Sequence, residues 1–275
     1  GPSFLLESIT GGEQVARYSF IGVNPGRAYV CRDRVIERRV NGHTDALPVP
    51  PGRDLLHVLD AELRQFQPGE THGLPRFSGG LVGYLGYDTI RFFEPKLHLG
   101  PHPTLPDAIF LLADTLVAFD HAFGRLLLIA NIHTALDANG NEAAARADAG
   151  RRLDELQAAI EGPLPARQAV ATPDCCTDLT SNMEQAEYMA AVEAAKEYIY
   201  AGDIFQVVLS QRFSRKTGAA PFDIYRALRR LNPSPYMFFF DFDGLTPGPL
   251  RLIGASPELH VRLEGREAAL RPIAG

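Results

Sequence analysis

The stretch LNPSPYMFFF occupies residues 231–240 and joins a proline-bracketed turn to a run of aromatic residues. Proline fixes the backbone and aromatic residues favour strands, so the pattern predicts a strand that begins directly after a rigid turn. A strand alone does not require two prolines, a tyrosine and a methionine at its start. The same residues also suit the wall of an apolar pocket, and both interpretations stay open at this point.

The segments around this stretch carry patterns of both helices and strands. Residues 221–232 place apolar side chains at helical spacing and predict an amphipathic helix directly before the turn. Residues 251–275 predict paired strands around a turn at Glu264–Gly265, where glycine suits a tight reversal. We therefore expect the stretch to be a strand that lies between a helix and a pair of strands along the chain.

A further helix is predicted upstream, over residues 181–201. Ser181 and Glu184 fit a capping box, in which each side chain bonds the backbone amide of the other residue. Gly202 fits the position just after a helix, since glycine adopts positive φ at little cost. The apolar segment IFQVVLSQRF follows at residues 204–213 and predicts a buried strand.

The first part of the chain is rich in β-forming residues and also carries two helical patterns. We expect strands at 16–22, 27–32 and 34–40, a helix at 53–67, a hairpin within 107–133 and a helix at 141–160. The segment GGLVGYLGYD, residues 79–88, has neither the lysine nor the spacing of a phosphate-binding loop. Its glycines are typical of close backbone packing within a strand.

Length and composition are those of a globular protein. The chain has 275 residues, 45% of them hydrophobic and 22% charged, and a formal net charge of −6. An acidic chain without a long basic run argues against general nucleic-acid binding, and no apolar run approaches the roughly 20 residues of a membrane helix. Cys31, Cys175 and Cys176 form neither a disulfide framework nor a zinc pattern, which favours a reducing cytoplasm.

One segment has several prolines and no periodicity, and we interpret residues 162–181 as a linker. This divides the chain into an N-terminal region, residues 1–161, and a second region, residues 182–275. Strands dominate the first region and mixed helices and strands fill the second, which favours an α+β fold over a regular parallel barrel.

Six segments, in their order along the chain, together resemble anthranilate synthase component I, a family of chorismate-utilising enzymes. They are FLLESITGGEQVARYSFIG, GGLVGYLGYD, YMAAVEAAKEYIYAGDIFQVVLSQRF, NPSPYMFFF, GASPE and RPIAG. The resemblance runs from Phe4 to Gly275. It implies an α/β sandwich of two large sheets, and we expect residues before and after the linker to share those sheets.

The resemblance also implies an activity. It implies ammonia-dependent conversion of chorismate to anthranilate and pyruvate with Mg²⁺, in tryptophan biosynthesis. A glutamine amidotransferase subunit would supply the ammonia, so we expect a hetero-oligomer and no nucleic-acid or membrane partner. The family continues beyond PIAG with its downstream histidine, magnesium carboxylates and most substrate-binding residues. We therefore expect a fold that is incomplete at the C-terminus, a chain that is inactive alone, and no metal ligand within it.

Two residues of the second region are candidates for the active site. The chemistry must neutralise two carboxylates and move protons through positioned groups. Glu258 in ASPE is the catalytic candidate, because the resemblance places it at the active-site cavity; without the resemblance it would be an ordinary surface carboxylate. Gly275 is implied to belong to the chorismate-binding turn, since glycine lets backbone amides approach a carboxylate.

Two further segments are implied to bind the feedback inhibitor tryptophan. The first is LLES, in which Glu7 can pair with the ammonium group and Ser8 can form a hydrogen bond. Arg17 is a further candidate partner for the carboxylate. The region 1–161 is therefore expected to carry an effector-site strand.

The second of these segments is NPSPYMF, residues 232–238. Pro235, Tyr236 and Met237 can form an apolar wall for the indole ring, with the polarizable methionine sulfur beside it. Asn232 could brace the turn. On this interpretation the two prolines shape the opening of an effector pocket.

Related enzymes and a non-enzyme remain as alternatives. Aminodeoxychorismate synthase component I shares the fold and substrate but retains the pyruvyl group, and PYMF after NPS resembles the anthranilate enzyme more. Isochorismate or salicylate synthase fits less well, because LLES and YSFIG resemble the amino-transferring branch. The third alternative is a non-catalytic tryptophan-binding fragment, which chorismate turnover would distinguish from an enzyme.

Overall fold

The structure is a computed structural model that describes residues 1–8, 17–66, 69, 71–94, 96–132, 141–164 and 179–270. Gly275, both Cys175 and Cys176, and most of the predicted linker lie outside the described residues. The chain forms two compact units. Unit 1 comprises Gly1–Leu164 and Leu228–Ser256, and unit 2 comprises Pro165–Ala227 and Pro257–Gly275. Each unit is therefore built from two separate stretches of the chain.

The larger sheet of unit 1 has six strands in the order β13-β12-β1-β2-β8-β9, and all neighbours are antiparallel. The strands are β1 (Ser3–Glu7), β2 (Tyr18–Val23), β8 (Thr115–Asp120), β9 (Arg125–Ala130), β12 (Tyr236–Asp241) and β13 (Arg251–Ser256). The last two follow the predicted linker along the chain, yet they pair with the first strand. The expectation that residues before and after the linker share a sheet is confirmed.

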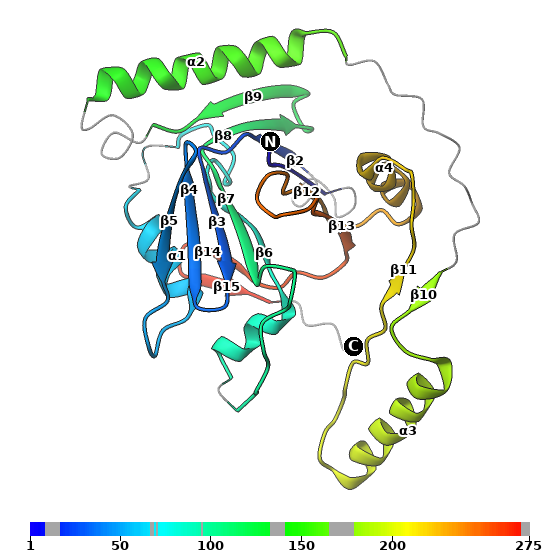
Figure 1. Ribbon diagram of the computed structural model, residues 1–275. Coiled ribbons are helices and arrows are strands. Elements are labelled where there is room, and N and C mark those ends of the chain that lie inside the picture. The colour runs from blue at the N-terminus through cyan, green and yellow to red at the C-terminus, as the bar shows by residue number, and fades with distance from the viewer. Residues whose placement is uncertain are drawn as a thin grey trace. The chain divides into compact units, whose positions relative to one another are not determined.

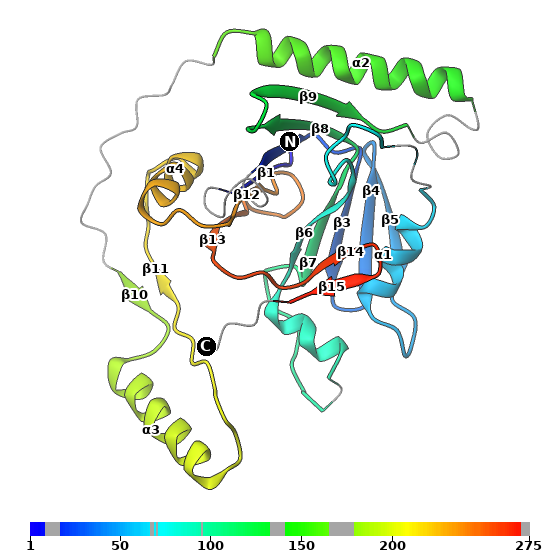
Figure 2. The same ribbon diagram turned by 180° about the vertical axis from the view of Figure 1, so that it is seen from behind.

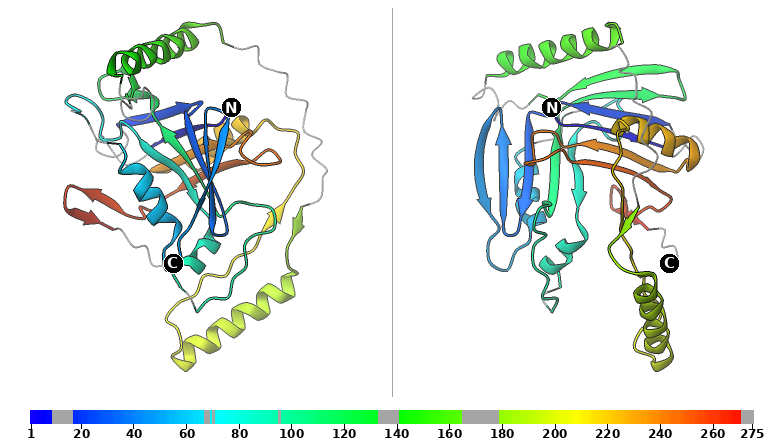
Figure 3. Two further views of the ribbon diagram at one scale, coloured as in Figure 1. Left: turned by 60° about the vertical axis from the view of Figure 1, so that its left-hand side comes forward. Right: turned by 45° about the vertical axis from the view of Figure 1, so that its right-hand side comes forward.

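The smaller sheet of unit 1 has five antiparallel strands in the order β5-β4-β3-β7-β6. They are β3 (Arg27–Arg32), β4 (Val35–Val40), β5 (His43–Pro48), β6 (Gly80–Leu85) and β7 (Ala108–Ala113). The other elements of this unit are the helices α1 (Leu55–Leu63) and α2 (Glu142–Glu161) and the 3₁₀ helix η1 (Tyr87–Phe92). The strands of the two sheets run in clearly different directions (Figure 3).

A shared core holds the two sheets face to face. On β7, Ile109 and Leu111 belong to a cluster that also contains Phe4 and Phe240 of the larger sheet. The alternate residues of β7 point the other way, because successive side chains of a strand face opposite sides of the sheet. Ala108 accordingly packs in a second cluster beneath α1. The expected α+β fold with a sandwich of two large sheets is confirmed.

The helices of unit 1 cover the outer faces of these sheets. α1 packs on the smaller sheet through Leu55 and Leu59 and lies beside β4 and β5 (Figure 2). α2 lies along β9 (Figure 1) and is tied there by Arg152, which donates hydrogen bonds to Thr115 Oγ1 and to the carbonyl of Asn131, both at 2.7 Å. The helix patterns predicted for both segments are confirmed, with α1 shorter than expected.

Unit 2 contains elements with little buried surface, and apart from the 17-residue α3 they are short. They are β10 (Thr180–Ser181), α3 (Gln185–Ala201), β11 (Phe213–Ser214), β14 (Arg262–Glu264), β15 (Glu267–Ala269) and most of α4 (Pro221–Leu231), whose residues 228–231 belong to unit 1. Gly202 ends α3 with a φ of 81°, and the β14–β15 hairpin turns at Gly265 with a φ of 60°. The glycine after the helix and the final turn are thus confirmed.

Two predictions for residues 181–213, the start of the helix and the strand after it, are wrong. α3 begins at Gln185, and its capping box joins Glu184 to Glu187, whereas the Ser181 hydroxyl accepts from the amide of Met183. Residues 204–212 form no strand, and Phe205 is fully exposed. A strand needs a neighbouring strand to bond its amides and carbonyls. Of residues 204–214, only Phe213 and Ser214, which form β11, pair with another strand, namely β10.

Within residues 79–88, Gly83 serves close packing as predicted, whereas Gly80 adopts a φ of 130° and has nothing within 4 Å of a Cβ position. Gly83 lies in β6 opposite β7, and a Cβ atom at this position would overlap the carbonyl oxygen of Ile109. Any larger side chain would therefore push the two strands apart.

No helix among the described residues combines the length and hydropathy that a membrane crossing requires.

Candidate functional site

The two segments predicted to form the tryptophan pocket lie side by side in the larger sheet. β1 and β12 pair antiparallel, and Glu7 lies opposite Met237 in the register. Residues that lie opposite each other project from the same face of a sheet. The structure therefore brings the ends of LLES and NPSPYMF together, although nothing in their spacing along the chain requires it.

The two side chains at this position differ in their surroundings. Met237 is 1% exposed, whereas the side chain of Glu7 is 14% exposed. Leu5 and Phe239 form the next pair on the same face, so the carboxylate of Glu7 lies at the end of an apolar row. This face therefore carries a largely buried apolar row that ends in a partly exposed carboxylate.

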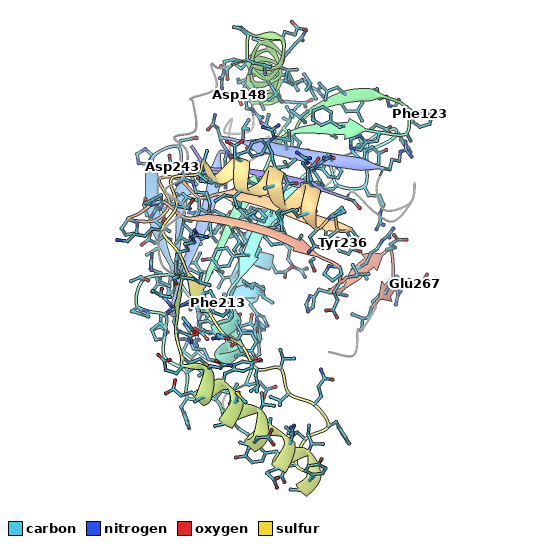
Figure 4. The ribbon with its side chains drawn as sticks, turned by 90° about the vertical axis from the view of Figure 1, so that its right-hand side faces the viewer. Phe123, Asp148, Phe213, Tyr236, Asp243 and Glu267 are labelled. Atoms are coloured by element: carbon cyan, nitrogen blue, oxygen red, sulfur yellow. The ribbon has the colours of Figure 1, made fainter. Side chains whose placement is uncertain are left out.

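Tyr236 does not share this face. It starts β12 (Figure 4) and lies opposite Ser256 of β13. Adjacent strand residues point to opposite sides, so Tyr236 projects away from the face that carries Met237 and Glu7. The predicted apolar wall of Pro235, Tyr236 and Met237 is thus divided between two faces of the sheet at this point.

Hydrogen bonds to the main-chain groups of Asn232 hold the turn before β12. The amide of Asn232 donates to the carbonyl of Leu228 at 2.8 Å, and its carbonyl accepts from Ser234 Oγ at 3.2 Å. Ser234 is buried, Pro235 is half-buried and Asn232 is exposed. Asn232 therefore contributes to the turn through main-chain groups, and it lies outside the buried part of this face.

A second charged residue joins the site from the last turn of α4. Arg229 Nε donates to Glu7 Oε2 at 3.1 Å, and the arginine side chain is 47% exposed. The sequence analysis did not single out Arg229. Its only signal was the ALRRL pattern, in which arginines near a helix C-terminus ordinarily complement the helix dipole.

Arg17, the other candidate partner for a ligand carboxylate, is engaged elsewhere. Its Nε and Nη2 donate to the two oxygens of Asp120 at 3.1 and 3.0 Å. The Asp120 side chain has no exposed surface and accepts a further bond from Arg125 at 3.2 Å. The hydrogen bonds and charge of Arg17, with those of Arg125, hold the pKa of Asp120 below its usual value despite burial.

The two residues predicted for the active site belong to unit 2. Glu258 is exposed and follows the end of β13 by two residues along the chain. Gly275 lies outside the described residues. The structure therefore neither groups these residues into a site nor separates them. No three His, Cys, Asp or Glu side chains in the described chain converge where a metal ion could be held.

Residues 2–275 match a protein family described as chorismate binding enzyme. This chain belongs to the chorismate-binding enzyme family. Two curated relatives are named anthranilate synthase component 1. That of Cereibacter sphaeroides is 40% identical over 278 residues, covering 99% of this chain and 54% of the relative. That of Streptomyces coelicolor is 42% identical over 283 residues, covering 99% and 49%.

A solved structure has a similar fold over most of this chain. The crystal structure of anthranilate synthase component I from Streptococcus pneumoniae TIGR4 matches with a TM-score of 0.69 and 29% identity. The match covers 94% of this chain and 55% of that one. The resemblance found in the sequence is thereby confirmed, and the chain spans about half the length of the curated relatives it matches.

The fit to magnesium can be tested on the residues present. Mg²⁺ is usually bound through carboxylates in octahedral geometry. Because the described residues of this chorismate-binding enzyme offer no such cluster, they do not fit a magnesium site.

Proposed function

We propose that the whole protein to which this chain belongs makes anthranilate and pyruvate from chorismate and ammonia, in tryptophan biosynthesis and in the cytoplasm. The observation that carries the proposal is the family match over residues 2–275 together with relatives named anthranilate synthase component 1.

The reaction requires proton transfers that a carboxyl group can perform. Ammonia adds to the ring of chorismate and a ring hydroxyl leaves as water, which needs a proton. Pyruvate is then eliminated as the ring loses a proton and becomes aromatic. We assign Glu258 as the general acid–base candidate, since its carboxyl group can donate and accept a proton. Its exposure in the structure leaves it accessible to a substrate.

Several partners belong to this proposal through the resemblance. A glutamine amidotransferase subunit would supply ammonia, which makes the working enzyme a hetero-oligomer. Gly275 would approach a chorismate carboxylate with its backbone amide. Mg²⁺ belongs to the proposal as a cofactor implied by the resemblance, and its ligands would lie outside the residues that the structure describes.

The proposal includes feedback inhibition by tryptophan at the outer face of β1 and β12. The supporting observation is that Glu7 and Met237 lie opposite each other with an arginine beside them. Glu7 would bind the ammonium group, Ser8 would add a hydrogen bond, and Met237 would contact the indole ring. Pro235 and Asn232 would shape the opening, and Tyr236 would support β12 from the opposite face.

The activity is tested by supplying the whole protein with chorismate, ammonium and magnesium and measuring anthranilate by its fluorescence. We expect anthranilate to form, and Glu258→Gln to lower kcat by about 100-fold or more, within the range of general acid–base catalysis. Glu267→Gln is the matched control, because Glu267 is an exposed glutamate on β15 in the same unit (Figure 4).

Three results would contradict the proposal. Accumulation of aminodeoxychorismate without anthranilate would favour the sister enzyme. Tryptophan binding without any chorismate turnover would favour a non-catalytic tryptophan-binding protein. Equal activity of Glu258→Gln and Glu267→Gln would remove Glu258 from the chemistry.

A further inference from the structure

We propose that a pocket of unit 1 between η1 and β13 binds a small aromatic amine, with the ammonium group at the carboxylate of Asp88 and a ligand hydroxyl at Nε2 of His102. The pocket has a volume of about 200 Å³ and is lined by residues of β6, η1, β13 and the loop before β7. The inference goes beyond the proposed function and does not rest on it. It gives the end of the segment GGLVGYLGYD a role other than strand packing.

The pocket lies on the other side of the larger sheet from Glu7 and Met237. Leu252 lines the pocket and pairs with Phe240, whose side chain belongs to the core between the two sheets. Side chains alternate along a strand, so Phe240 and Met237 face opposite sides of the sheet. A ligand in this pocket would therefore not touch the face proposed for tryptophan.

Hydrogen bonds between two separate stretches of the chain build the pocket. The amide of Gly86 donates to the carbonyl of Asp107 at 2.7 Å, and a Cβ atom at Gly86 would lie only 3.1 Å from that oxygen. Tyr84 Oη donates to the carbonyl of Pro106 at 2.9 Å. Because these bonds form without a ligand, binding requires little further ordering of the protein.

The size and the walls of the pocket favour a ligand with one aromatic ring. The apolar part of the lining consists of Tyr84, Tyr87, Leu105, Pro106, Leu250 and Leu252. An apolar cavity of roughly 150 Å³ can hold benzene, so this pocket suits a single ring with a short chain. Tyr87 is 88% exposed, and its ring can contact a ligand cation through its face.

The charge of the ligand follows from the two carboxylates of the lining. Asp107 is paired, since Arg91 donates to its two oxygens at 2.8 and 2.7 Å. Asp88 is half-buried, and within the described ranges no hydrogen bond or ion pair reaches its carboxylate. The first turn of η1 offers it only the weak positive end of a six-residue helix. An ammonium group would replace the hydration that this carboxylate loses on partial burial.

The hydrogen-bonding role of His102 is set by the loop that contains it. Its Nδ1 accepts from the amides of Thr104 at 3.2 Å and Leu105 at 3.0 Å. The proton of the neutral ring is therefore on Nε2. No partner for Nε2 occurs in the part of the chain that the structure describes, so this N–H can donate to a ligand oxygen.

Chemical-shift titration of the nitrogen-15-labelled full chain with three probes tests the inference. The probes are tyramine, which has both polar groups, tyrosol, in which a hydroxyl replaces the ammonium, and phenethylamine, which lacks the phenolic hydroxyl. We expect tyramine to shift the amide signals of residues 86–88 and 250–252. It should bind about 10-fold more tightly than tyrosol, as for a charge-assisted contact.

A charge-removing variant and a matched control test the ammonium contact. Asp88→Asn should weaken tyramine and phenethylamine by about 10-fold and leave tyrosol unchanged. Glu94→Gln removes the charge of an exposed glutamate that follows η1 and does not line the pocket, so it should bind all three probes like the parent. Melting temperatures show whether each variant is folded.

A second variant tests the hydroxyl contact. His102→Asn keeps an acceptor for the loop amides, because asparagine forms the same kind of turn, but it lacks the N–H at Nε2. It should weaken tyramine and tyrosol by about 3- to 10-fold and leave phenethylamine unchanged.

Three results would overturn the inference. If the parent shows no shifts at residues 86–88, or if Asp88→Asn binds tyramine as tightly as Glu94→Gln does, the pocket does not receive an amine at Asp88. Shifts at residues 5–7 in place of 86–88 would assign the amine to the opposite face of the larger sheet. Equal affinities of parent and His102→Asn for tyramine would contradict the contact between His102 and the hydroxyl.

Discussion

Glu7 lies directly opposite Met237 where β1 pairs with β12. One residue comes from the beginning of the chain and the other from its last quarter, and the same register places both on one face of the larger sheet. The arrangement explains why a buried methionine and a partly buried carboxylate occur together. The methionine supplies an apolar floor, and the carboxylate lies beside it within reach of Arg229.

The packing between β6 and β7 gives a stability prediction. Gly83→Ala should lower the free energy of unfolding by roughly 1–3 kcal/mol, because its methyl group would overlap the carbonyl oxygen of Ile109. Gly100→Ala is the control, since a Cβ atom there would meet nothing within 4 Å and its φ is not positive. Urea unfolding of both variants measures the difference. Equal stabilities would show that β6 can move away from β7 freely.

The buried Asp120 gives a prediction about pH. Arg17, with help from Arg125, lowers its folded pKa below the unfolded value of about 3.9. A carboxyl group with a lowered folded pKa stabilises the fold above its unfolded pKa, and this stabilisation is lost as the pH falls through the folded pKa. Asp120→Asn should therefore be less stable at neutral pH and lose less stability than the parent below about pH 4.

Urea unfolding at a series of pH values tests this prediction, with the exposed Asp243→Asn as a control. We expect the stability difference between parent and Asp120→Asn to shrink steadily on acidification. A difference that stays constant between neutral and acid pH would show that Asp120 has no lowered pKa in the folded chain.

Cys31 should be chemically inert in the folded chain. It is 2% exposed, and its Sγ donates to the carbonyl of Asp33 at 3.6 Å. Burial, together with the charge of Asp107, raises the thiol pKa to about 12, so almost no thiolate forms near neutral pH. Mass spectrometry of the Cys31 peptide should show no iodoacetamide adduct before unfolding and full labelling in guanidinium chloride. Equal labelling in both conditions would place Cys31 at an accessible surface.

Local patterns in the sequence predicted individual elements well. The runs RAYVCR and RVIERRV became β3 and β4, and the periodic segment at 141–160 became α2, because each carries its own pattern and pairs or packs locally. The apolar segment 107–121 was less informative. A single polar pair, Asp114–Thr115, interrupts its apolar residues, and the structure divides it there into β7 and β8, which belong to different sheets.

Features that depend on distant partners could not be read from local patterns. The strand expected at residues 204–213 is strongly apolar, but a strand forms only where a neighbour accepts its hydrogen bonds. The pairing of β1 with β12 joins distant segments, and only the family resemblance indicated that LLES and NPSPYMF meet. The resemblance gave no register, so the separation of Tyr236 from Met237 and the contact of Arg229 with Glu7 required the structure.

The most direct test of the account is tryptophan inhibition of anthranilate formation by the whole protein, with Met237→Thr compared with Tyr236→Phe. Met237 shares the face of Glu7, whereas Tyr236 starts the same strand on the opposite face. Loss of apolar contact with the indole, about 1–2 kcal/mol, should raise the half-inhibiting tryptophan concentration of Met237→Thr by roughly 5- to 30-fold. Turnover without tryptophan should remain nearly unchanged, and Tyr236→Phe should follow the parent curve. Superimposable inhibition curves for Met237→Thr and the parent, or turnover that falls in parallel with inhibition, would contradict an effector site at the pairing of β1 with β12.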